Sequence, residues 1–203
     1  MASRRQRRVT LVTGLALAVS ACGAPPSPDR EPPPAVVERV FGPGGRVNLH
    51  LSAGKYTIGP SADGQLRLSW TTRAPEDRRK VRVDVQSSGA EATVRTEGPS
   101  SNFEVVLAVP EQSHLWIRLS AGDLTIRGIE GHKDLSGWAG EFKIAVGDGS
   151  AYRQVRTSVL AGEIAAPALQ RTTGGVFRSF EWDGPGKYDL RVRLTAGQIQ
   201  LHD

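Results

Sequence analysis

Short runs in which every second residue is apolar recur along the chain from about residue 39 to its end. Polar or charged residues stand between the apolar ones, so each run predicts a β-strand with one dry face and one wet face. No segment keeps a helical period over three turns, and 23 glycines and 13 prolines punctuate the chain too densely for long helices. The pattern predicts an all-β domain over residues 39–203. The clearest runs are Leu66, Leu68 and Trp70; Val81, Val83 and Val85; Phe103, Val105, Leu107 and Val109; Leu115, Ile117 and Leu119; and Leu190, Val192 and Leu194.

A short glycine phrase repeats inside this domain. Each copy has Ala then Gly, one polar residue, and then apolar residues at alternate positions. The copies are LSAGKYTI (51–58), LSAGDLTI (119–126), WAGEFKI (138–144), VLAGEIAA (159–166) and LTAGQIQL (194–201). The aligned glycines, which we expect to form structural turns, are Gly54, Gly122, Gly140, Gly162 and Gly197, with Gly175 as a degenerate sixth.

The spacing of these glycines favours a stack of short strands, the β-solenoid or β-helix type of architecture. Steps of 18, 22, 13 and 22 residues connect Gly122 to Gly197, and stacked coils of such length share one core. The alternative is an antiparallel β-sandwich, in which the glycines would be bulges or hairpin turns. Gly54 and Gly122 are 68 residues apart, so the first half departs from a clean repeat.

The N-terminal segment has the three parts of an export signal: four arginines within residues 4–8, an apolar run over residues 9–18, and small residues before Cys22. Val19, Ser20, Ala21 and Cys22 resemble the lipobox of bacterial lipoproteins. That resemblance implies cleavage of a signal peptide, residues 1–21, between Ala21 and Cys22, and lipidation of Cys22 as a membrane anchor. The alternatives are a secreted protein with a chance cysteine at its cleavage site and, for the export route, twin-arginine instead of Sec.

A proline-rich stretch follows the cysteine. Six prolines lie within residues 23–34, and proline favours an extended backbone, so residues 22–38 are predicted to be a tether. A proline-rich docking motif is the alternative. Cys22 is the only cysteine, which excludes an intramolecular disulfide.

The positive net charge belongs mainly to the signal segment. Four of the 26 basic residues lie in it, which leaves 22 basic against 21 acidic side chains. The remaining chain lacks the electrostatic footprint of a nucleic-acid binder, and we expect no nucleic-acid partner.

With these residues in view, the region from about Arg39 to His202 resembles the putative-adhesin family of bacterial envelope proteins. The resemblance rests on FEVVLAVPEQSHLWIRLSAGDLTIRGIEG (103–131) and on the closing LRVRLTAGQIQL (190–201). It implies a right-handed, glycine-punctuated β-helix-like fold and placement in the cell envelope, facing the periplasm or the exterior.

Little in the sequence points to catalysis or to a metal. The four histidines have no partners at metal-ligand spacing, so neither a metal nor another cofactor is expected. Asp123, Glu141 and Glu163 each follow a repeat glycine, which would suit a carbohydrate-active β-helix lyase or glycosidase. Lys55 and Gln198 fill the same slot in other copies, and this favours a solvated edge and a protein that is not an enzyme.

One aromatic residue breaks the inward–outward rule. Trp116 stands between Leu115 and Ile117 and is therefore expected to point outward beside Arg118, whereas Trp70, Trp138 and Trp182 are expected in the core. Trp116 and Arg118 are the candidate binding residues. The leading hypothesis is a non-catalytic, lipid-anchored envelope protein, an adhesin or scaffold whose partner is a polysaccharide or an envelope protein. A structural or sensory envelope subunit is the further alternative.

Overall fold

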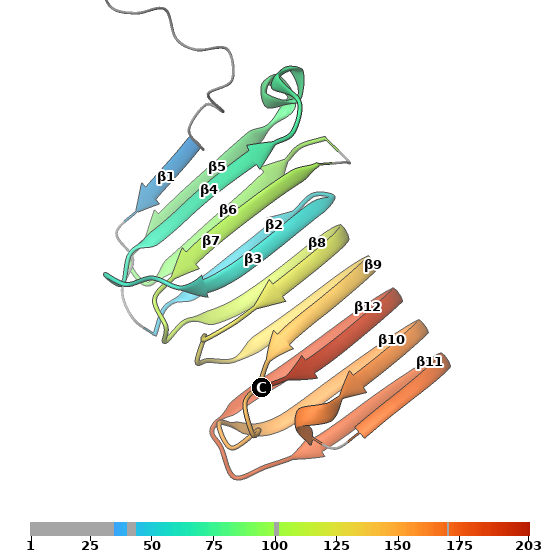
Figure 1. The fold of residues 1–203 in the computed structure, drawn as a ribbon. Helices are drawn as coiled ribbons and strands as arrows, with labels where there is room; N and C mark the ends of the chain where they lie inside the picture. The colour runs from blue at the N-terminus through green and yellow to red at the C-terminus, as the bar shows by residue number, and fades with distance from the viewer. Residues whose placement is uncertain (1–34, 40–43, 100–101, 170) are drawn as a thin grey trace, which may run out of the picture. The chain divides into compact units, whose positions relative to one another are not determined.

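The computed structural model describes residues 35–39, 44–99, 102–169 and 171–203. These residues form one mixed, unclosed β-sheet with two short 3-10 turns, so the all-β prediction is confirmed. No helix among them is long and apolar enough to cross a bilayer. The elements are β1 (Ala35–Arg39), β2 (Arg46–Leu51), β3 (Gly54–Pro60), β4 (Leu66–Thr72), η1 (Pro75–Lys80), β5 (Arg82–Ser88), β6 (Glu91–Glu97), β7 (Phe103–Val109), β8 (His114–Ile126), β9 (Lys133–Ala145), β10 (Tyr152–Ala166), η2 (Pro167–Leu169), β11 (Arg171–Asp183) and β12 (Tyr188–His202) (Figure 1).

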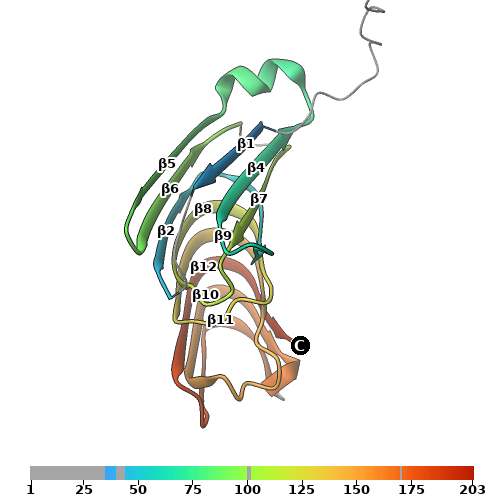
Figure 2. The ribbon, with the colours of Figure 1, turned by 90° about the vertical axis from the view of Figure 1, so that its left-hand side faces the viewer.

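The sheet bends so that its two halves face each other as two walls (Figure 2). The first wall contains β5, β6, β2 and the N-terminal halves of β8, β9, β12 and β10; the second contains β1, β4, β7, β3 and the C-terminal halves of the same long strands. The apolar side chains of both walls pack into one buried cluster between them. Because each long strand serves both walls, each contributes twice to the same core.

The bend lies at the repeated Ala-Gly pair. In β8 the odd-numbered Leu115, Ile117 and Leu119 are buried, whereas beyond Gly122 the even-numbered Leu124 and Ile126 are buried. The corner shifts the alternation by one residue, and both halves of the strand then face the same interior.

The repeat glycines lie side by side across the sheet. Gly54 pairs with Gly122, Gly122 with Gly140, Gly140 with Gly197, and Gly197 with Gly162. The four glycines after Gly54 have φ between +114° and +146°, a backbone conformation that disfavours L side chains. A Cβ atom on any of these four would lie 1.8 to 2.0 Å from the main-chain oxygen of the preceding glycine in the column. Close contact and backbone conformation therefore both require glycine.

The order of strands in space differs from their order along the chain. β12 lies between β9 and β10 and is parallel to both, so the last copy of the phrase is inserted between two earlier copies. Gly175 is paired with Gly162, but on β11, which runs antiparallel to β10. The 13-residue step to Gly175 is therefore a return of the chain and not another coil.

The first half contains a similar detour. After β3 the chain forms β4 and β5, which pair antiparallel with β7 and β6, and it then returns to β8 beside β2 and β3. This detour explains why Gly54 and Gly122 are adjacent although 68 residues separate them. Antiparallel strands thus border the parallel part of the sheet at both ends.

The described sheet begins four residues earlier than the domain boundary expected from composition. Residues 35–38, expected in the tether, pair with β4 as part of β1, because their backbone completes an antiparallel ladder along that strand. Ala21 and Cys22 lie outside the described residues, as does the rest of the expected signal peptide.

Candidate binding surface

The outer face of the first wall carries a continuous row of polar side chains that crosses six strands. We call it the arginine row: Arg95, His50, Arg118, Ser136, Arg193 and Ser158. Each member is the direct register partner of the next, and the strands in order are β6, β2, β8, β9, β12 and β10. An arginine stands on every second strand of this row.

Three shallow hollows follow one another along this row. The first, of about 410 Å³, contains Arg95, His50 and Arg118. The second, of about 360 Å³, shares His50 and Arg118 with the first and extends to Ser136 and Arg193. The third, of about 560 Å³, shares Ser136 and Arg193 with the second and reaches Ser158. Because neighbouring hollows share lining residues, they form one interrupted groove that crosses the strands.

Trp116 lies on the outer face of β8, two residues before Arg118, and borders the second hollow. It is half-buried, because the guanidinium carbon of Arg46 on the neighbouring strand lies 4.1 Å from its ring centroid. A cation held over an indole ring at this distance is attracted by the ring's negative face. The arginine covers part of the ring, and the rest borders the groove.

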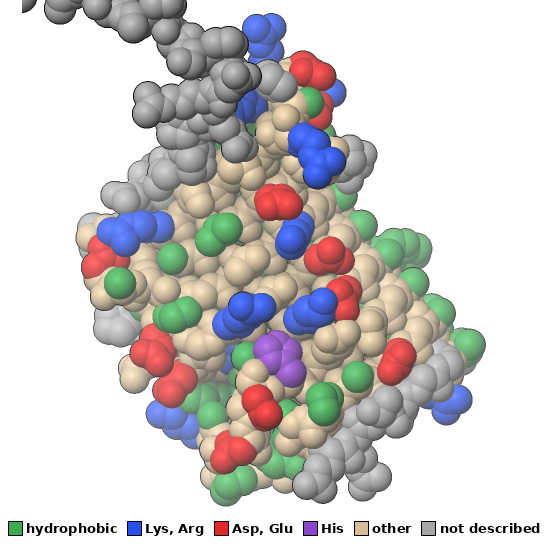
Figure 3. Space-filling view, viewed as in Figure 1, with side chains coloured by type: hydrophobic (Ala, Val, Ile, Leu, Met, Phe, Trp, Pro, Cys, Tyr) green, Lys and Arg blue, Asp and Glu red, His purple; other side chains and the backbone are tan. Residues whose placement is uncertain are grey.

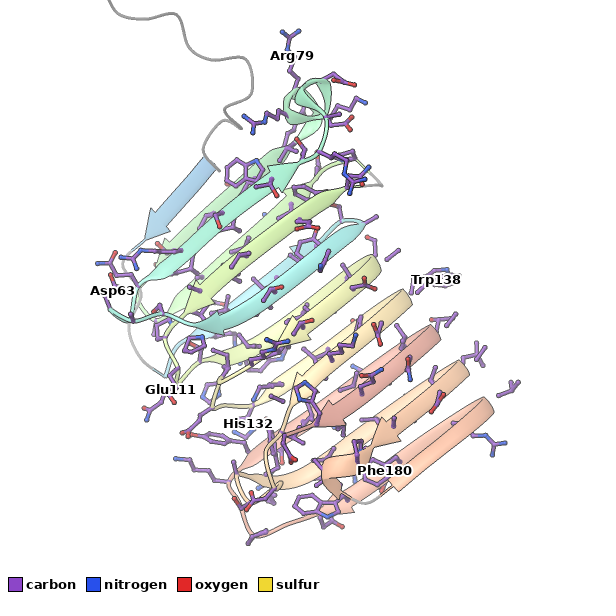
Figure 4. All side chains as sticks on the ribbon, viewed as in Figure 1. Asp63, Arg79, Glu111, His132, Trp138 and Phe180 are labelled. Atoms are coloured by element: carbon purple, nitrogen blue, oxygen red, sulfur yellow. The ribbon has the colours of Figure 1, made fainter. Side chains whose placement is uncertain are left out.

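Trp138 is on the surface and not in the core, so this prediction was wrong. Its side chain is 70% exposed and projects from the corner of β9 (Figure 4). Lys133 and Leu135 are buried, so Trp138 shares the outward side of the strand with Ser136. Trp70 and Trp182 are partly buried against the core.

Trp138 belongs to an exposed apolar edge. Leu160 on β10 and Val176 on β11 are 42% and 59% exposed, and both lie near the same bend of the sheet. Leu160 also borders the third hollow. Trp116 lines the groove two residues before Arg118, and Trp138 stands on β9 two residues after Ser136, outside the lining of the three hollows.

A cluster of titratable groups lies at the other end of the first wall, where β8, β9 and β12 begin. The ring centroids of His114 and His132 are 5.0 Å apart, and the main-chain N–H of His132 donates to Nδ1 of His114 at 3.0 Å. Partial burial lowers the pKa of His114, and the neighbouring His132, Arg46 and Lys133 lower it further. Among the described residues no group of three potential metal ligands is assembled.

Lys133 is buried below this cluster. Its ammonium donates to the hydroxyl of Tyr152 at 2.6 Å and to the main-chain oxygen of Ile129 at 2.7 Å. Burial lowers the pKa of Lys133 to about 8, while burial raises the pKa of Tyr152. The contacts satisfy the polar atoms of both side chains inside the domain, so this pair closes the end of the core.

The outer face of the second wall carries a contrasting acidic row. Glu104, Lys55, Asp123, Glu141, Gln198 and Glu163 are successive register partners along it. Figure 3 shows acidic side chains spread over this face, with Lys and Arg side chains between them. Glu141 is held by Lys143 at 2.8 Å and by the amide of Gln200 at 2.7 Å. None of the three hollows of the groove includes a carboxylate of this row.

Of the arginine row, only Arg118 was predicted from the sequence as a binding residue. The position of most of the other members relative to the repeat glycines would have identified them. His50, Arg118, Ser136, Ser158 and Arg193 each stand four residues before a repeat glycine. Trp138 occupies the position two residues before the glycine, where other copies have Ser120 and Thr195. Alignment of the phrases beyond the glycine itself would have placed Trp138 outward.

Comparisons with known proteins relate this chain to others through its fold alone. No protein-family model matches the sequence, and no curated protein matches it. A putative cell adhesion protein from Clostridium sporogenes ATCC 15579 has a similar solved structure, with a TM-score of 0.52 and 12% identity over 84% of this chain and 99% of that chain. A putative adhesin from Bacteroides fragilis NCTC 9343 covers 84% of this chain and 98% of its own, at 8% identity and a TM-score of 0.25. At 12% identity, what this chain shares with the Clostridium protein is the fold.

Proposed function

We propose that this chain is a non-catalytic, adhesin-like binding protein of the bacterial cell envelope, anchored through a lipid on Cys22. The outer face of the first wall would be its binding surface. The name of the Clostridium protein of similar fold supports a role in adhesion, and the lipobox-like residues at 19–22 support the anchor.

We interpret the parallel part of the sheet as a β-solenoid-like stack whose function is display. Each of the long strands β8, β9, β12 and β10 presents one residue of the arginine row, and the glycine column lies at the bend of the same strands. Rigid strands hold a row of side chains more accurately than loops do, which suits recognition of an extended partner.

The observation that carries this proposal is the groove along the arginine row, which Trp116 lines, with the exposed Trp138 two residues beyond Ser136 on β9. Exposed aromatic and arginine side chains are the residue types that contribute most to binding surfaces.

The experiment is capture of cell-envelope fractions and of arrayed glycans by the purified full-length protein. We expect binding that is lost when Trp138→Ala and Arg118→Ala are combined and retained in Lys55→Ala, a charge removal on the second wall. Unfolding midpoints of both variants establish that they remain folded. Failure to bind any envelope fraction or glycan would overturn the proposal, as would turnover of a polysaccharide that Asp123→Asn or Glu141→Gln abolishes.

A further inference from the structure

The arginine row has a regular charge spacing. Its arginines, Arg95, Arg118 and Arg193, lie on β6, β8 and β12, with one strand between each pair. Strands are separated by about 4.8 Å, so the arginine positions repeat about every 10 Å and the whole row spans about 24 Å. His50 and the two serines between them provide neutral hydrogen-bonding groups at the intermediate steps.

The central arginine has no competing partner among the described residues. No hydrogen bond or ion pair joins the Arg118 guanidinium to the rest of the described chain, and the residue is exposed. Arg193 contacts Asp134 at 3.1 Å and Arg95 lies 3.9 Å from Asp84, and both arginines are more than half exposed. Surface pairs of this kind contribute only about 0 to 1 kcal/mol each, so breaking them to bind another anion costs little.

The two rows differ in charge at matched positions. The arginine row contains no carboxylate, whereas the row on the second wall contains Glu104, Asp123, Glu141 and Glu163. Carboxylates of the first wall lie beside the row: Glu97 lines the first hollow and Asp134 lines the second. A polyanion that follows the arginine row would meet three arginines, whereas one that follows the second row would meet four carboxylates and Lys55.

The spacing argues against a nucleic acid as this polyanion. Duplex DNA has a phosphate about every 3.4 Å along each strand, three times as dense as the arginine positions. A polysaccharide with one carboxylate in every second sugar has a charge spacing of the right order, because two linked sugar rings are about as long as one repeat of the row. Trp138, whose side chain is 70% exposed, offers an indole ring to the apolar face of a sugar. Trp116, which Arg46 partly covers, lines the second hollow.

We propose that the groove binds an acidic polysaccharide, extended across the strands, with one carboxylate at each arginine and the intervening sugar over His50 or Ser136. This inference rests on the proposed function and specifies the chemistry of its partner. It also sets the length of chain recognised: three disaccharides fill the row from Arg95 to Ser158.

The test is titration of the purified full-length protein with hyaluronate oligosaccharides, which carry one carboxylate per disaccharide, followed by tryptophan fluorescence. We expect affinity to rise with length up to three disaccharides and then to level off. Arg118→Ala should weaken binding about tenfold and Arg118→Lys less, because lysine keeps the charge and loses the bidentate contact. Lys55→Ala is the matched control and should leave affinity unchanged.

Three outcomes would overturn the inference: equal binding of neutral dextran, tighter binding of single-stranded DNA of similar length, or equal affinity of Arg118→Ala. If envelope fractions still bind while hyaluronate does not, the partner chemistry is wrong and the proposed function stands. If neither binds, both fail.

Discussion

Gly140 lies directly beside Gly122 on the neighbouring strand, and a Cβ atom added to Gly140 would lie 1.8 Å from the main-chain oxygen of Gly122. The same relationship recurs down the column of repeat glycines, so the bend of the sheet depends on the absence of side chains there. This contact is the physical reason for the repeat seen in the sequence.

We predict that Gly140→Ala destabilises the domain by about 3 kcal/mol or more, because a φ of +137° is strained for alanine and the adjacent strand would have to move. Urea unfolding followed by circular dichroism measures the change. Gly59→Ala is the control: no atom lies within 4 Å of its added Cβ, and we expect a change within about 0.5 kcal/mol. Equal effects of the two substitutions would contradict the role of the column.

Trp138→Ala should change the free energy of unfolding by no more than about 0.5 kcal/mol, because the side chain is 70% exposed. Leu135→Ala, three residues earlier and fully buried, should cost about 2 to 5 kcal/mol. Both values come from the same unfolding measurement. A large loss in Trp138→Ala would mean that the indole packs against the domain.

The buried lysine predicts how stability depends on pH. The pKa of Lys133 is about 8 in the folded protein against 10.5 for an ordinary lysine, so between these values the unfolded chain holds a proton that the folded chain has released. Stability therefore rises with pH across this window, by about 2 kcal/mol between pH 7 and pH 9.5.

Urea unfolding at those two pH values tests this prediction, and in Lys133→Met the rise should disappear. Measurements stop at pH 9.5, because the pKa of Tyr152 is raised in the folded protein. Above about pH 10 the tyrosine ionises in the unfolded chain only, and this lowers the free energy of unfolding. An identical pH dependence in Lys133→Met would show that other groups produce the rise.

The lipid anchor makes its own prediction. Cys22→Ser should leave the protein without acyl chains, and the protein should move from the membrane fraction to the soluble fraction of the cell. Mass spectrometry and metabolic labelling with palmitate measure the acyl chains. The substitution lies outside the described sheet, so the unfolding midpoint of the domain should not change. A labelled protein in Cys22→Ser would disprove lipidation at this position.

Alternation of apolar residues was enough to predict the strands and the buried face of most of them. Leu115, Ile117 and Leu119 are buried as expected, and so are Leu190, Val192 and Leu194. The pattern succeeds because a strand with one buried face has apolar residues at alternate positions wherever it lies in the sheet.

The order of the strands could not be predicted in this way. The copies of the phrase that contain Gly140, Gly162 and Gly197 are nearly equivalent, so any of them can pair in register with another, and the position of β12 between β9 and β10 depends on how the chain returns through β11. The arginine row could not be predicted for the same reason. Arg95 joins it from β6, which lacks the glycine phrase, and only the folded sheet places it beside His50.

Hydroxyl-radical footprinting of the purified protein, with and without isolated cell envelope, tests the central claim most directly. If the outer face of the first wall is the binding surface, Trp116 and Trp138 lose reactivity when envelope is added, and Tyr56 in the core serves as an unreactive reference in both states. Protection confined to the second wall or to the edge strands β1, β5 and β11, with Trp138 as reactive as in the free protein, would contradict the account.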